Sequence, residues 1–215
     1  MLMLASRPAA TGGDTVSEWA LAGKPGLLVV HMQNSICKVG GSLEGMGHCQ
    51  AVRAAGIIPN IQALQTGFRA RQLPVIFVVA QHPEKFHVPA YGPFWPAARD
   101  LGINLKGTED VQIIDELAPA AGEPIFCNWP FDVFRVNKLE KHLRRQGVET
   151  VVLTGVATGM AISHASFSLA DRLFSLIVPS DTCADARANL HQAVLEEMLP
   201  PIGLITTTED VLAHL

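Results

Sequence analysis

Residues 26–34 read GLLVVHMQN, a short apolar run, rich in leucine and valine, that ends in polar side chains. An apolar run of this length without alternation is typical of a strand that is buried on both faces of a sheet. A second run of this type, PVIFVVA at residues 74–80, opens with a proline, which a strand tolerates at its first position. Strands of this kind favour a parallel sheet that is covered by helices on both faces.

The rest of the chain alternates between short β-rich runs and longer helical patterns. We predict further strands at residues 124–127, 150–154, 174–178 and 204–206. We predict helices at residues 54–71, 137–146, 158–172, 187–198 and from 208 onward, and a long loop with one short helical piece at residues 81–110. This order predicts an α/β fold, a single three-layer α/β/α domain with a mainly parallel sheet of about six strands. We expect the domain to span residues 24–215, after an N-terminal extension at residues 1–23.

Composition narrows the function classes. Of 215 residues, 48% are apolar and 17% are charged, and the net charge of −4 is spread without runs. A chain of this kind folds into a globular core and lacks the basic stripe of a nucleic-acid-binding protein. Arg7 interrupts the apolar N-terminus, and no window approaches the ~18 apolar residues of a membrane span, so neither export nor membrane insertion is expected. The cysteines are far apart, which favours reduced thiols in the cytoplasm; they are Cys37, Cys49, Cys127 and Cys183.

The candidate functional residues are those that directly follow the predicted strands. In a parallel α/β sheet, ligands bind at the carboxyl ends of the strands. The segments to consider are residues 31–34, 81–87, 128–131 and 155–161.

At these strand ends the sequence resembles the isochorismatase-like superfamily, whose members are often called cysteine hydrolases. Residues 27–34, LLVVHMQN, resemble its opening strand, which ordinarily ends in Asp-x-Gln-Asn. Residues 123–128, EPIFCN, align with the segment that delivers a lysine, and residues 155–161, GVATGMA, match a Gly-Val-x-Thr-x-x-Cys turn. Residues 180–184, SDTCA, resemble a Ser-Asp-Ala-x-Ala segment. The resemblance runs from about Lys24 to the C-terminus and implies the same fold.

The catalytic triad that the resemblance implies is not present. His31 stands at the Asp position, Asn128 at the Lys position and Ala161 at the Cys position. In the family the carboxylate takes the thiol proton, the ammonium supports the anionic intermediate, and the thiolate attacks a carbonyl or nitrile carbon. Alanine has no nucleophilic atom and asparagine has no charge. We therefore expect no thiol-dependent amidase activity by this route.

Other nucleophiles are poorly placed. Strand alternation points Cys127 away from the face that Asn128 occupies, which favours a core position. Ser163 lies two residues after Ala161 and points nearly the opposite way on a helix. Cys37, on a glycine-rich loop, is the least excluded thiol, although the sequence places no acid or base beside it.

Acid–base or electrostatic chemistry would need no thiol. The isochorismatase reaction of the superfamily cleaves an enol ether by protonation, and His31 could supply a proton near neutral pH. The alternative is a hydrogen-bonded core histidine in a pocket that has lost its activity. The turn Val156-Ala157-Thr158 leads into a helix N-terminus, and in the family this turn, often with a cis peptide, forms the oxyanion hole. Such a turn without a nucleophile would suit a carboxylate ligand.

Metal and ligand contacts complete the site hypothesis. Nicotinamidase-like members of the family carry an Asp-x-His and a second histidine; here His82, Glu84 and His87 are present, but no aspartate precedes His82. We predict no metal and no cofactor. Aromatic side chains after the strands would hold a planar ligand, cover the end of the sheet, or pack in a subunit contact. The predicted substrate-binding residues are Gln33, Trp95, Trp129, Phe131, Val156, Ala157 and Thr158.

Two functions of different class remain open. The first is a divergent hydrolase or lyase of a small aromatic or carboxylated metabolite, with His31 as the acid–base group. The second is a catalytically inactive member of the family that binds a small ligand or a partner protein. The high apolar fraction and the family's habit of oligomerising lead us to expect a homodimer or a higher homo-oligomer.

Overall fold

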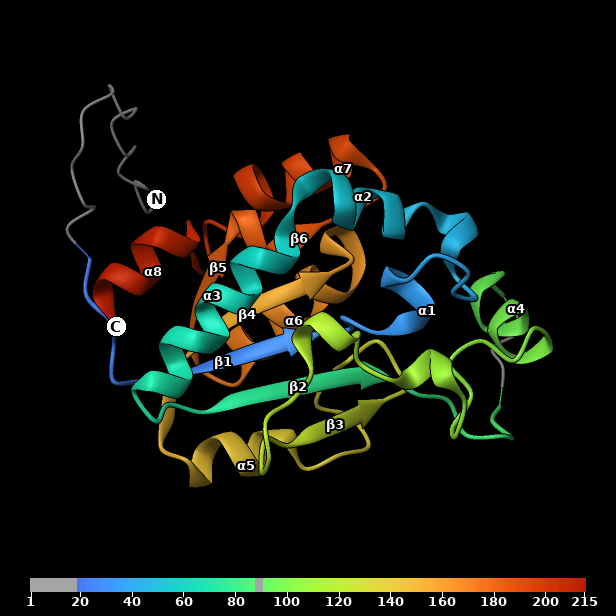
Figure 1. Cartoon of the computed structure of the whole chain (residues 1–215), viewed down its shortest axis with the longest axis horizontal. Coiled ribbons are helices and arrows are strands. Elements are labelled where there is room, and N and C mark those ends of the chain that lie inside the picture. Colours follow the sequence, from blue (N-terminus) through green and yellow to red (C-terminus); the bar gives the residue numbers. More distant parts are fainter. Residues whose placement is uncertain (1–18, 88–90) are drawn as a thin grey trace, which may run out of the picture.

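The sheet at the centre of the molecule contains only parallel strands. The computed structural model describes residues 19–87 and 91–215, and in these residues seven strands form one sheet of the order β3-β2-β1-β4-β5-β7, with β6 paired to β4 (Figure 1). The strands are β1 Lys24–Val30, β2 Val75–Ala80, β3 Ile125–Asn128, β4 Val148–Val156, β5 Ser175–Pro179, β6 Cys183–Ala184 and β7 Leu204–Thr206.

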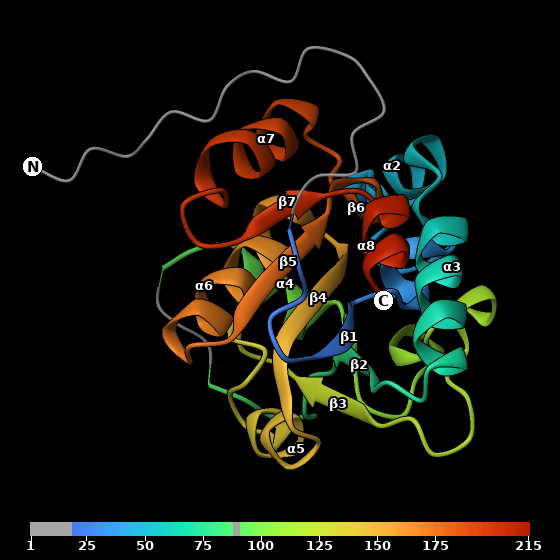
Figure 2. The ribbon, with the colours of Figure 1, turned by 90° about the vertical axis from the view of Figure 1, so that its left-hand side faces the viewer.

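Helices cover both faces of the sheet. The helices are α1 Asn34–Cys37, α2 His48–Ala55, α3 Ile57–Ala70, α4 Phe94–Asp100, α5 Leu139–Arg145, α6 Ser163–Asp171, α7 Ala188–Ala193 and α8 Thr208–His214. Figure 2 shows α2, α3 and α8 on one side of the sheet and α5, α6 and α7 on the other. Two π-helical turns, Thr158–Ile162 and Val194–Met198, precede α6 and follow α7. The predicted three-layer α/β/α domain is confirmed.

Each central strand contributes to two hydrophobic cores. In β1, Leu27 and Val29 are buried in the core that contains Phe68 of α3, while Leu28 and Val30 are buried in the core that contains Leu143 of α5. Successive side chains of a strand point to opposite faces, so an uninterrupted apolar run is required where both faces are covered.

The observed elements differ from the prediction in several places, and three of them have a clear local cause. The helix expected at residues 54–71 is two helices, because Gly56 takes a left-handed conformation (φ 63°) and ends α2. The helix expected at residues 137–146 begins at Leu139, whose backbone N–H donates to the Asn137 side chain (3.0 Å). The two-residue strand β6 was not predicted and raises the number of strands to seven.

The direction in which the strands are connected reverses between β1 and β4. From β1 the chain adds β2 and then β3 on one side, and it then crosses to β4 on the other side of β1. At such a reversal the loops of neighbouring strands leave a crevice at the carboxyl ends, where ligands bind. No helix in the described residues is both long enough and apolar enough to cross a membrane.

Candidate functional site

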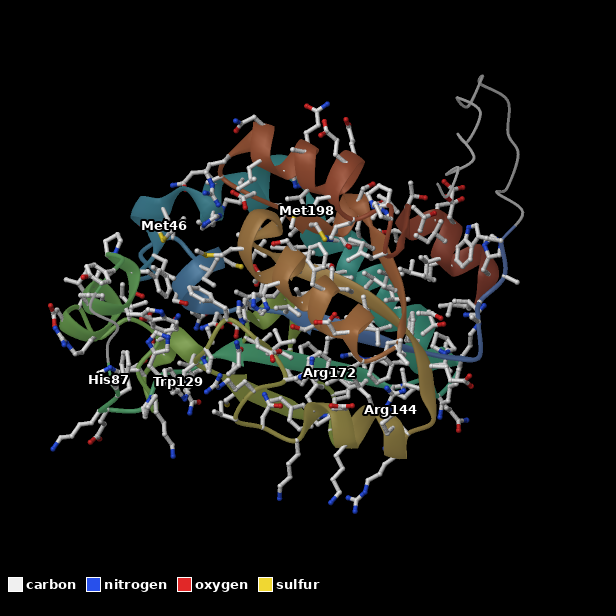
Figure 3. All side chains as sticks on the ribbon, turned by 180° about the vertical axis from the view of Figure 1, so that it is seen from behind. Met46, His87, Trp129, Arg144, Arg172 and Met198 are labelled. Atoms are coloured by element: carbon white, nitrogen blue, oxygen red, sulfur yellow. The ribbon has the colours of Figure 1, made fainter. Side chains whose placement is uncertain are left out.

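A cavity of about 80 Å³ lies at this reversal, at the carboxyl ends of β1 to β4. Figure 3 labels Met46 and Trp129, two residues of its lining, at the end of the molecule toward which these strands point. The lining residues are His31, Ile36, Leu43, Met46, His48, Ala80, His82, Phe94, Trp95, Asn104, Asn128, Trp129, Pro130, Phe131, Val156, Ala157, Met160 and Ala161. His31, Asn128 and Ala161, the three residues that the resemblance placed at the triad positions, therefore border one space.

A hydrogen bond joins two of these three side chains. His31 Nε2 lies 3.0 Å from Asn128 Oδ1, and Asn128 Nδ2 donates to the Pro130 carbonyl (2.7 Å). A carbonyl oxygen only accepts, so the amide nitrogen of Asn128 must face Pro130 and its oxygen must face His31. His31 Nε2 is consequently the protonated nitrogen, and in the neutral ring the lone pair is on Nδ1.

His31 is the residue at which the chain turns out of β1. Its backbone is left-handed (φ 56°), a conformation in which histidine is enriched among non-glycine residues. Its backbone N–H donates to the Val78 carbonyl of β2 (2.8 Å), which fixes the turn. Burial lowers the pKa of His31 below its ordinary value; the Asn128 hydrogen bond opposes this shift, and the nearby His82 adds to it. His31 is therefore neutral at pH 7.

The turn that precedes α6 keeps its backbone form but is already partly occupied. The Val156–Ala157 peptide is cis, and both residues line the cavity. The Gly159 N–H donates to the Asp185 carboxylate (2.8 Å), and the Met160 N–H donates to the Ala157 carbonyl (3.1 Å). Two of the turn's donors are thus satisfied within the protein.

Two of the predicted ligand contacts are not in the cavity lining. The Gln33 side chain is fully buried; its oxygen accepts the Ala80 N–H (2.7 Å) and its nitrogen donates to Asn104 Oδ1 (3.1 Å). Gln33 therefore ties the end of β1 to β2 and to the loop around Asn104. Thr158 is also fully buried, with its hydroxyl 2.9 Å from His191 Nδ1.

The histidines that follow β2 do not form a metal site with neighbouring residues. His82 is buried and half-exposed Phe86 packs against its ring, whereas His87 is exposed. Over residues 19–87 and 91–215, no three His, Cys, Asp or Glu side chains gather closely enough to hold a metal ion.

The remaining thiols are not activated. Burial raises the pKa of Cys37 to about 12 and also raises the pKa of half-buried Cys127. Neither cysteine lines the cavity. The nucleophile is the thiolate, so neither residue is equipped to replace the absent cysteine at Ala161.

The cavity is lined both by predicted residues and by residues that were not predicted. Trp95, Trp129 and Phe131, which were predicted to contact a ligand, line it, and their role in binding stays a prediction. The cavity is also lined by residues that no motif or strand end indicated, among them Ile36, Leu43, Met46, His48 and Asn104. Most of these come from the segment between β1 and α2, where Gly40 and Gly41 interrupt any periodicity that could have indicated a wall.

Comparison with known proteins identifies the family of the chain and supports its fold. The family model described as the isochorismatase domain matches residues 25–210, most of the chain. The chain belongs to the isochorismatase family. Its similarity to a cysteine hydrolase structure from Pseudomonas syringae pv. phaseolicola (TM-score 0.78, 22% identity, 89% of this chain and 92% of that chain) supports the fold.

Curated relatives of this isochorismatase-family chain are hydrolases. It is 30% identical to the ureidoacrylate amidohydrolase RutB of Pseudomonas syringae pv. syringae over 206 residues. The matched region covers 87% of this chain and 82% of the relative. It is 26% identical to the maleamate amidohydrolase of Pseudomonas putida, over 89% of this chain and 87% of the relative. The family is thus a hydrolase family.

Proposed function

We propose that the chain is a divergent isochorismatase-family hydrolase or lyase that acts on a small metabolite without a cysteine nucleophile, with His31 as its acid–base group. The observation that carries the proposal is the His31–Asn128 pair, which holds a neutral imidazole at the cavity with its lone pair on Nδ1. A histidine whose tautomer and orientation are fixed by a second side chain is arranged for proton transfer.

The lowered pKa of His31 keeps the ring unprotonated at neutral pH, so His31 would enter the reaction as a base and not as an acid. At pH 7 the ring is neutral, so it would take a proton from a water molecule that attacks the substrate and then return that proton to the leaving group. No described residue hydrogen-bonds to Nδ1, which leaves this atom available for that water.

Replacing His31 with alanine is expected to lower turnover by about 100-fold, the usual contribution of a general base. Purified protein would be incubated with a panel of small aromatic amides, carboxylated amides and enol ethers, and products would be followed by NMR. His142→Ala, which removes a histidine of α5 away from the cavity, serves as the control and should retain full activity. Unchanged turnover of a converted substrate by the His31→Ala protein would contradict the proposed role.

The second candidate is a catalytically inactive member of the family that binds a ligand or a partner protein. Ala161 favours it, since this position has no nucleophilic atom and no cysteine among the described residues lines the cavity. Ligand-induced thermal stabilisation without any conversion of the same ligand would select this candidate over the enzyme.

The substrate class follows from the relatives and from the cavity walls. Ureidoacrylate and maleamate, the substrates in the names of the two relatives, are small carboxylates. The walls of the cavity here are aromatic. We therefore propose a small aromatic or carboxylated metabolite. The four cysteines are all unpaired, which supports a cytoplasmic location.

We also propose that the chain forms a homodimer. Four large apolar side chains are 36–42% exposed and line one shallow surface groove beside the cavity; these are Phe131, Met160, Phe167 and Met198. Exposed apolar groups that gather in one place mark association sites. Sedimentation is expected to give a dimer at tens of micromolar, and Phe167→Glu is expected to shift it to a monomer of 23.1 kDa. A monomeric parent protein would contradict the proposal.

A further inference from the structure

The cavity has no charged wall. Among the residues that the structure describes, no Asp, Glu, Lys or Arg side chain lines it. Its polar groups are two amides, Asn104 and Asn128, and three imidazoles, His31, His48 and His82. Burial lowers the pKa of each of these histidines, so the imidazoles are neutral at pH 7. For His48, Asp185 opposes the shift and Arg187 adds to it.

The helix N-terminus beside the cavity already holds a carboxylate. The Asp185 side chain is 0% exposed; Oδ2 accepts the Gly159 N–H (2.8 Å), and Oδ1 accepts the Arg187 N–H (3.0 Å). The N–H groups and the dipole of a helix N-terminus would otherwise attract an anionic ligand. A second carboxylate at this turn would meet the negative charge of Asp185, which an ion pair with Arg187 (3.3 Å) offsets in part, and no cationic side chain among the described residues lines the cavity itself.

Aromatic rings that pack against one another form part of the cavity wall, and the wall contains an unused polar group. The ring centroids of Trp95 and Phe131 lie 5.0 Å apart, and those of Trp95 and Trp129 lie 6.0 Å apart. His82, 3% exposed, packs against Trp95, and its Nδ1 has no hydrogen-bond partner among the described residues. An unpaired buried nitrogen is costly, and a ligand that pairs with it removes this cost.

We infer that this cavity selects an uncharged molecule with hydrogen-bonding groups and discriminates against carboxylates. The inference rests on the proposed function in one respect, since it takes the cavity as the ligand site. It narrows the proposed substrate class from aromatic or carboxylated molecules to neutral ones. The physical reason is that a carboxylate would lose its hydration in an apolar space that offers no positive charge in return.

Two probes of nearly equal shape test the inference, benzamide and benzoate. Their dissociation constants would be measured at pH 7.5 by ligand-observed NMR and calorimetry. We expect benzamide to bind at least about tenfold more tightly than benzoate. Equal binding of the two probes, tighter binding of benzoate, or binding of neither would overturn the inference.

A positive charge introduced at the mouth of the cavity provides a second test of the preference for uncharged ligands. Met160 lines the cavity and is 40% exposed in the single chain, so Met160→Lys places an ammonium at the mouth of the cavity. Because Met160 also lines the groove proposed for dimer formation, sedimentation must first show that the Met160 variants keep the oligomeric state of the parent protein. We expect this variant to bind benzoate at least about fivefold more tightly than the parent protein, whereas Met160→Gln should leave the preference unchanged. A preference for benzamide that the new lysine does not reduce would also count against the inference.

His82 provides a second readout that separates binding from folding. His82→Leu is expected to weaken benzamide about tenfold while leaving the midpoint of urea unfolding unchanged or higher, because an unpaired buried polar atom is removed. Unchanged benzamide affinity would show that this nitrogen does not meet the ligand. None of these measurements depends on turnover, so loss of the His31 mechanism and loss of the neutral-ligand preference are distinguishable.

Discussion

Replacing Gly155 with alanine is expected to destabilise the fold by about 4 kcal/mol or more. Gly155 lies in β4 beside Val30 of β1 and has a φ of 122°, which L side chains rarely adopt. A methyl group added there would lie 2.0 Å from the Val30 carbonyl oxygen and 2.9 Å from its carbon. Both are backbone atoms of the central strand, so β1 and β4 would have to separate at the cavity. Urea unfolding followed by circular dichroism measures the loss.

Gly122→Ala separates the steric cost from the conformational cost. Gly122 also has a positive φ (89°), but a methyl group added there meets nothing within 4 Å. Its replacement should cost only about 1 kcal/mol, the penalty for a side chain at positive φ. If both variants lose the same free energy of unfolding, the contact with Val30 is not what requires a glycine at residue 155.

The sheet could be predicted from the sequence because a strand that is buried on both faces requires a continuous run of apolar residues. Residues 26–30 and 74–80 are continuously apolar because successive side chains of a strand buried on both faces enter different cores, as Leu27 and Leu28 of β1 do. The strand β6 shows no such run, because two residues, Cys183 and Ala184, are too few to show a pattern. The break at Gly56 was missed for a different reason: a single glycine does not by itself end a helical pattern, and the left-handed backbone angle of Gly56 is what separates α2 from α3.

The candidate site could be predicted only where it follows strands. His31, Asn128 and Ala161 are brought together by the parallel sheet, whose carboxyl ends meet at one edge. The wall that contains Leu43 and Met46 depends on how a loop folds back over that edge, which no local pattern encodes. Gln33 also follows a strand and was predicted to contact a ligand, but its side chain hydrogen-bonds to Ala80 and Asn104 instead. A polar residue after a strand can therefore stabilise a loop and make no ligand contact.

We expect a triple variant, His31→Asp with Asn128→Lys and Ala161→Cys, to contain a reactive thiol. The single Ala161→Cys variant is not expected to contain one. Ala161 is 9% exposed and borders a cavity without charge, so a thiol placed there keeps its proton, as Cys37 does, whose pKa burial raises to about 12. Adding Asn128→Lys supplies a nearby ammonium that lowers the thiol pKa, and His31→Asp supplies a carboxylate to take the proton. The thiolate fraction at pH 7 should rise by about 100-fold or more between the single and the triple variant.

The pH profile of iodoacetamide labelling, read by mass spectrometry on the peptide that contains position 161, measures this difference directly. The single Ala161→Cys variant is the control for access, because both proteins present the thiol in the same place. Labelling of the triple variant at neutral pH, where the single variant labels only at high pH, would mean that the backbone still holds these positions in a hydrolytic geometry. The side chains at positions 31, 128 and 161 alone would then account for the loss of thiol chemistry in this chain. Identical profiles would instead mean that the cavity no longer places a cation and a carboxylate against position 161, and the acid–base role proposed for His31 would lose its geometric basis as well.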